Sequence, residues 1–180
     1  MAVASKAFID QFNQVIALLT NALESSGSIR KFRDELFFFL DQNHEFYLSA
    51  SPEERDEIRK IVKRQLTTNE TAFIDSFLFG YMQRAIENIE RTGEIIWLTR
   101  GLVACSIEDS IRDQRDNTTH LSLLYIAAEE KSLNPKPEFQ AIAEISSDEI
   151  SSGGNISMSE LMKNIPNIAR TTYENWKEYS

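Results

Sequence analysis

The sequence predicts an all-α protein of about eight helices in antiparallel hairpins, arranged as an α-solenoid-like stack or as a helical bundle. Apolar residues recur three and four positions apart along most of the 180 residues, which is the spacing of one helix face. The chain contains no alternating apolar and polar stretch long enough to form a sheet. Paired helices with short loops and a spacing of about 40 residues from pair to pair suit both arrangements.

The first three predicted helices have recognisable boundaries. The first runs from Ser5 to about Ser25, and the second from about Ser28 to Asn43. The third opens at Ser51-Pro52-Glu53-Glu54, where a serine cap precedes a proline and two acids that favour the positive end of the helix dipole. His44 follows the second helix, so we expect it in a turn at the surface.

The later helices are predicted from apolar periodicity and from breakers. The fourth runs from about Glu70 to Arg91, where Gly93 breaks it, and Gly80 within it is expected to permit close helix packing. The fifth and sixth lie in the apolar runs between Ile95 and Ala128, which are apolar on nearly every helical face and should be innermost. Shorter helices are expected at about 138–145, 157–164 and 167–179. The serine- and glycine-rich segment 146–155 is the expected flexible loop of a single domain, 1–180.

Composition restricts the partners. The net charge of −9 argues against nucleic acid, which needs a basic face to displace counterions, and favours a basic protein. No apolar window approaches the roughly 20 residues that span a bilayer, so we expect no membrane partner and a cytoplasmic location. The single cysteine, Cys105, lies in an apolar run and is expected to be buried.

A dense group of charges separates the two central apolar runs. If one helix continued through it, Glu108 and Arg112 would lie one turn apart, and so would Asp116 and His120. One interpretation is a partly buried salt-bridge network. The alternative is a metal or acid–base site, because divalent ions accept carboxylate and imidazole ligands. The whole cluster comprises Glu108, Asp109, Arg112, Asp113, Arg115, Asp116 and His120.

The segment from about 95 to 128 resembles a HEAT-type helical repeat. In such repeats an aspartate in the turn and an arginine early in the second helix join neighbouring units. Asp113, Arg115 and Asp116 lie near those positions, whereas the proline and alanine pattern of the family is absent. The resemblance covers about a fifth of the chain and implies a stack of helix hairpins.

An aromatic-rich segment is the second candidate site. Phe37, Phe38 and Phe39 are consecutive, so they point around a helix and cannot all face one core, and Phe46 and Tyr47 follow closely. The segment is either a helix buried on two sides or an interaction surface whose exposed rings anchor a partner.

These features lead to three functional hypotheses. The leading one is a non-catalytic protein-binding module without a cofactor, such as an adaptor or an immunity-type inhibitor of a basic partner. The second is a metal-dependent enzyme that uses the acidic and histidine cluster at 108–120. The third is a helical regulatory domain that binds an apolar ligand between its helices. No residue is assigned as catalytic or as a metal ligand.

Overall fold

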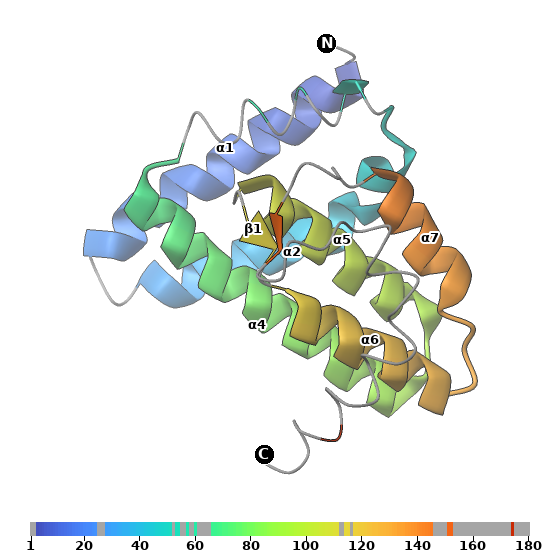
Figure 1. Ribbon diagram of the computed structural model, residues 1–180. Helices are drawn as coiled ribbons and strands as arrows, with labels where there is room; N and C mark the ends of the chain where they lie inside the picture. Colours follow the sequence, from blue (N-terminus) through green and yellow to red (C-terminus); the bar gives the residue numbers. More distant parts are fainter. Residues whose placement is uncertain are drawn as a thin grey trace. The chain divides into compact units, whose positions relative to one another are not determined.

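The structure is a computed structural model of the chain that describes residues 3–24, 28–51, 53–54, 57, 60, 66–111, 114–115, 117–145, 151–152 and 174. Its regular secondary structure is helical apart from one very short strand pair, which confirms the all-α prediction (Figure 1). The chain divides into two compact units, 1–77 and 78–180, and each is described by itself. The described helices are α1 (Val3–Glu24), α2 (Ile29–Ser49), α4 (Thr68–Thr92), α5 (Ile95–Ile111), α6 (Thr118–Glu130) and α7 (Lys136–Ile145).

Helices α1 and α2 form an antiparallel hairpin in the first unit. The ring of Phe8 lies 5.0 Å from that of Phe39 and 6.2 Å from that of Tyr47. Further along α1, the Asn43 amide donates to Gln11 Oε1 across 3.0 Å. Residue numbers therefore increase along α1 in the direction in which they decrease along α2, so the two helices are antiparallel. The buried face of α1 has the predicted helical spacing and includes Phe8, Phe12, Val15 and Leu19, with Ile9 also buried.

Helix α2 extends further than the sequence predicts, because it continues past Asn43 to Ser49. The first breaking signal after Asn43 is Pro52, which disfavours helical backbone in the preceding residue, and Ala50 is already extended. The surface position predicted for His44 is therefore wrong: the residue lies inside the helix and is 6% exposed.

Two helix starts in the first unit are capped by side chains. The backbone N–H of Glu54 donates to Ser51 Oγ across 3.1 Å, which confirms the predicted serine cap. Thr67 and Glu70 form a reciprocal capping box at the start of α4, each side chain accepting the other residue's backbone N–H. The first turn of α4 is thereby stabilised.

The second unit contains the two helices predicted to be innermost. Every residue from Gly101 to Asp109 in α5 and from Leu121 to Ala128 in α6 is buried, which confirms that prediction. Both runs are apolar around most of the helix, as burial on all sides requires. Helix α5 contacts α6 and α7 (Figure 1), and the Tyr125 ring of α6 packs edge-on against Phe139 of α7 at 5.3 Å.

Gly101 lies where α4 and α6 both come close to the backbone of α5. A Cβ atom added there would lie 2.8 Å from Leu124 Cδ2 and 3.1 Å from Ala85 Cβ, so α4 and α6 both pack directly on α5. The packing role predicted for Gly80 is wrong, because that residue is exposed. Gly93 ends α4 as predicted, with φ +68° and its N–H donating to the Ile89 carbonyl oxygen.

The segment between α5 and α6 is not helical throughout. Helix α5 ends at Ile111, and β1 (Gln114–Arg115) pairs in parallel with β2 (Ser151–Ser152) before α6 begins at Thr118. One continuous helix across 108–120, the condition for those i,i+4 pairs, is therefore not met, because Gln114 and Arg115 are extended. Arg112 and Asp116, which the pairs require, lie outside the described residues.

Three predictions fall largely outside the described residues. Only Ser151 and Ser152 of the segment 146–155 and Glu174 of the last predicted helix are described, and the predicted helix at 157–164 lies outside. In the described part of the chain, no helix is both long enough and apolar enough to cross a membrane.

Candidate functional site

A half-open groove of about 580 Å³ lies between α1 and α2. Each helix contributes residues at positions i, i+3, i+4 and i+7, which form one helix face over two turns. The groove therefore follows the hairpin and is built entirely within the first unit. The lining residues are Gln11, Gln14, Val15 and Leu18 from α1, and Glu35, Phe38, Phe39 and Gln42 from α2.

Burial separates the floor of the groove from its walls. Val15 and Phe39 are buried and belong to the hairpin core, so they form the floor. Leu18 is half-buried on the α1 side. Phe38 is 61% exposed on the α2 side, although a phenyl ring gains free energy by leaving water. The groove thus offers apolar surface that a partner could cover.

The five aromatic residues predicted to form an interface differ in their exposure to solvent. The expectation that Phe37, Phe38 and Phe39 cannot all face one core is confirmed, because Phe38 is exposed, Phe37 is half-buried and Phe39 is buried. Tyr47 is buried and Phe46 is half-buried, and both rings contact Phe8. Phe38 is therefore the ring of this set that a partner could most readily contact.

Amide side chains form the polar edge of the groove. Gln11, Gln14 and Gln42 can each donate and accept hydrogen bonds. Gln11 is held by Asn43, whose amide also donates to the Phe39 carbonyl oxygen across 2.8 Å. This contact fixes one end of the groove to the backbone of α2.

The second candidate site is a buried polar junction at the end of α5. Asn117 precedes α6, and its amide nitrogen lies 2.9 Å from the Cys105 carbonyl oxygen, 3.1 Å from Glu108 Oε2 and 3.0 Å from Asp109 Oδ1. Asn117, Glu108 and Asp109 are all buried, which confirms that part of the charge cluster is removed from water. We call these four residues the Asn117 junction. Asn117 is not among the site residues predicted from the sequence. An asparagine directly before a helix is a capping signal, but the Asn117 side chain makes no capping hydrogen bond and contacts α5 instead.

The remaining cluster residues are placed as follows. Arg112, Asp113 and Asp116 lie outside the described residues, and Arg115 is described by its backbone in β1. The salt-bridge network therefore stays a prediction. Within the described ranges, no three His, Cys, Asp or Glu side chains converge as a metal site would require.

His120 lies on α6 against an aromatic ring of α4. Its ring centroid is 4.9 Å from that of Phe79, and burial lowers the pKa of His120 below its ordinary value of 6.5. Its Nδ1 is buried, with no hydrogen-bond partner among the residues that the structure describes. The geometry favours the neutral imidazole, packed as an aromatic ring.

Trp97 of α5 interacts with two arginines. The guanidinium carbons of Arg84 and Arg100 lie 5.0 Å and 4.8 Å from the centre of its ring. Cation–π contacts of this kind contribute about 0.5–1 kcal/mol each where they are partly exposed. Arg84 belongs to α4, so its contact with Trp97 helps to hold the α4–α5 pair together.

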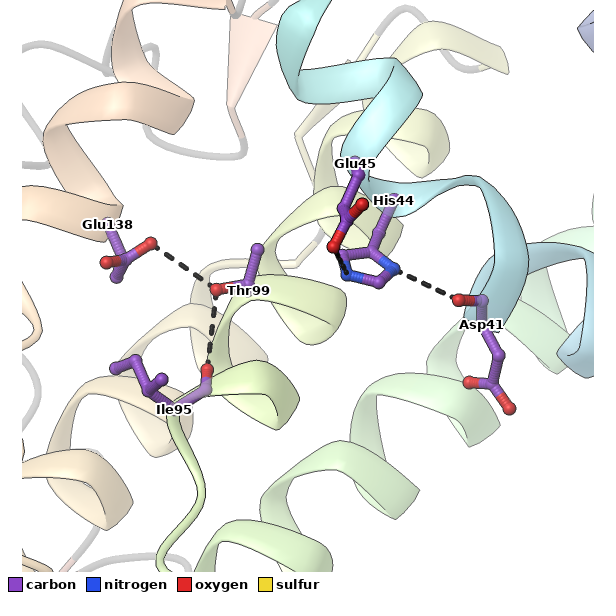
Figure 2. A network of polar contacts seen from close by, with 6 residues as sticks. All are labelled: Asp41, His44, Glu45, Ile95, Thr99 and Glu138. Atoms are coloured by element: carbon purple, nitrogen blue, oxygen red, sulfur yellow. Dashed lines mark hydrogen bonds and ion pairs between the residues drawn. The ribbon is translucent and has the colours of Figure 1, made fainter.

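Two further groups of polar contacts have structural roles (Figure 2). Within α2, His44 Nδ1 lies 3.0 Å from the Asp41 carbonyl oxygen, and Nε2 lies 4.0 Å from Glu45 Oε1. In the second unit, the Thr99 hydroxyl lies 3.4 Å from the Ile95 carbonyl oxygen and 3.3 Å from Glu138 Oε2. The contact with Glu138 joins α5 to α7.

Comparisons with protein families, with curated proteins and with solved structures found no match to this chain. The groove and the Asn117 junction are the two features of the described residues from which a function can be inferred.

Proposed function

We propose that the protein is a non-catalytic protein-binding module of the cytoplasm, acting as an adaptor or as an immunity-type inhibitor of a basic partner, and that the α1–α2 groove is its binding site. The observation that carries this proposal is the 61% exposure of Phe38 beside an apolar groove floor. Interfaces are commonly anchored by an aromatic side chain that becomes buried on binding.

The charge of the chain supports a basic partner. With a net charge of −9, the protein repels polyanions and attracts cationic proteins. Complementary charge raises the rate of association more than it slows dissociation. Charge therefore brings the partner to the surface, and the ring and the groove floor hold it.

The finer architecture predicted from the sequence, a stack of antiparallel hairpins with about eight helices, is part of the same proposal. It is supported by the antiparallel course of α1 and α2, where Phe8 contacts Tyr47 and Gln11 contacts Asn43. Stacks of this kind present extended surfaces to their partners.

The test is quantitative affinity isolation from the native cells with three forms of the full chain: wild type, Phe38→Ala and Ile95→Ala. Ile95 is the matched control, because it is a second exposed large apolar residue, 41% exposed, in the other unit. We expect a basic protein that wild type and Ile95→Ala retain and that Phe38→Ala retains at least about tenfold less, since an anchor residue is worth about 2 kcal/mol or more. Binding of the purified partner must reproduce the difference. An equal loss of the partner with both variants would contradict the proposed site, and so would no loss with either variant.

A further inference from the structure

We propose that the segment of the partner that enters the groove is a basic amphipathic α-helix of two to three turns, which packs on α1 and α2 as a third helix. This inference rests on the proposed function and names the conformation and the charge of the bound segment. It follows from three properties of the groove: the backbone of its walls, the shape of its apolar surface and the charges along its edges.

The walls offer no edge for an extended peptide to join. Both walls are continuous α-helices, in which backbone N–H and C=O groups bond within the helix. A bound strand gains affinity mainly from main-chain hydrogen bonds to a sheet edge, and the groove lacks such an edge. A helix, in contrast, satisfies its own backbone and contributes only side chains.

The apolar surface matches one face of a helix. The lining residues span i to i+7 on both α1 and α2, a rise of about 10 Å, or two turns. Leu18 and Phe38 stand on opposite walls above the floor residues Val15 and Phe39. Apolar side chains at i, i+3 or i+4, and i+7 of a third helix would lie in this cleft as ridges lie in a groove.

The charges along the groove select a basic helix. Glu35 is the one charged residue that lines it. By helical register, Asp10 lies one turn before Gln14, and Glu45, whose side chain is 88% exposed, lies three residues after Gln42. Asp34 and Asp41 lie one turn before and three residues after Phe38, and Asp34 is paired with Arg33. Lys31, one turn before Glu35, is the cation at this spacing. The excess of carboxylates over ammonium groups favours lysine or arginine beside the apolar stripe of the bound helix.

The first experiment is a selection from a displayed library of random 20-residue peptides on the full-length protein, with counter-selection on Phe38→Ala. We expect the enriched peptides to carry net positive charge and apolar residues with helical period. The best peptide is then made in three forms: unchanged, with a central proline, and with its cationic residues replaced by glutamate. Fluorescence anisotropy should show at least tenfold weaker binding for each altered form.

Variants of the protein, each tested with the unchanged peptide, examine the same contacts. Phe38→Ala should weaken binding of the unchanged peptide at least tenfold, whereas Ile95→Ala should leave it within twofold. The double variant Glu35→Gln, Glu45→Gln should bind more weakly, with a smaller dependence on salt. All four positions are exposed, and circular dichroism of each variant checks that the fold is kept.

The outcomes separate this inference from the proposed function. Enrichment of proline-rich, extended or acidic peptides that still depend on Phe38 would overturn the basic helix and leave a peptide-binding groove. Failure to enrich any Phe38-dependent peptide would count against the groove as a binding site. Concentration-dependent dimerisation of wild type that Phe38→Ala abolishes would assign the groove to a second copy of the chain, which also overturns the inference.

Discussion

The side-chain amide of Asn117 donates to the backbone carbonyl oxygen of Cys105, across 2.9 Å and between the start of α6 and the interior of α5. The same nitrogen lies within hydrogen-bonding distance of the buried carboxylates of Glu108 and Asp109. An amide nitrogen carries two protons, so it is shared among three acceptors. Asn117 therefore links α5 and α6 at a point where buried carboxyl and carbonyl oxygens share one donor nitrogen.

Replacing this amide should destabilise the protein. We expect Asn117→Ala to lower the free energy of unfolding by about 2–4 kcal/mol, because buried acceptors lose a donor that water cannot replace. Urea denaturation measures the change. Thr119→Ala, at an exposed position two residues later in α6, is the control and should stay within about 0.5 kcal/mol of wild type. A similarly small loss for Asn117→Ala would show that the junction contributes little to stability.

Asn117→Asp separates charge from shape. The substitution keeps the volume and replaces the donor by a third carboxylate beside Glu108 and Asp109. At pH 7 we expect a larger loss than for Asn117→Ala, because like charges would be buried together. Urea denaturation of both variants at pH 7 measures the difference, and a loss for Asn117→Asp no larger than that for Asn117→Ala would exclude the electrostatic explanation.

The two glycines Gly101 and Gly80 should respond in opposite directions to the same substitution. Alanine favours a helix over glycine by about 1 kcal/mol, so exposed Gly80→Ala should raise the melting temperature. At Gly101 the added methyl group would lie 2.8 Å from Leu124 Cδ2, and overpacking should outweigh that gain, for a net loss of about 1–3 kcal/mol. Calorimetry of both variants is the measurement. Stabilisation by Gly101→Ala would show that α5 does not pack as described.

His120 should make stability depend on pH. Burial lowers the pKa of His120 in the folded protein, so the unfolded chain binds a proton more readily as pH falls below about 6.5. The contribution of His120 is therefore complete above that pH and decreases as the pH falls toward the folded pKa. We expect His120→Gln to flatten the fall in unfolding free energy between pH 7 and pH 5. Thr119→Gln, at the exposed neighbouring position, should keep the wild-type dependence of unfolding free energy on pH. The same pH dependence in wild type and both variants would show that His120 does not cause it.

The sequence predicts local features of this fold better than contacts between helices. The apolar runs between Ile95 and Ala128 indicate helices buried on all sides, and burial depends on composition around one helix. Which glycine lies at a helix crossing depends on the neighbouring helix, so the periodicity of α4 gave Gly80 a role that belongs to Gly101. His44 was misplaced because no breaker follows Asn43 until Pro52.

The candidate sites show the same difference. Consecutive phenylalanines imply that one ring lies outside the core, but the groove beside Phe38 exists only because α1 packs against α2. The burial of Glu108 and Asp109 follows from the apolar runs that flank them. Their contact with Asn117 could not be predicted, because it depends on where α5 ends and on how the chain returns to α6.

Phe38 and Phe39 are neighbours in the chain with opposite expected roles. Phe39 is 4% exposed and packs against Phe8 and Phe12, so Phe39→Ala should cost about 3–5 kcal/mol through lost burial and a cavity. Phe38→Ala removes an exposed ring and should change stability by less than about 0.5 kcal/mol. Urea denaturation of the two variants measures both values. Phe38→Ala should also lower the fluorescence of a dye that binds exposed apolar grooves, because it removes apolar surface. Ile95→Ala should leave the fluorescence of dye bound in the groove unchanged. A stability loss for Phe38→Ala as large as that for Phe39→Ala would place both rings in the core, and the partner surface would then have to lie elsewhere.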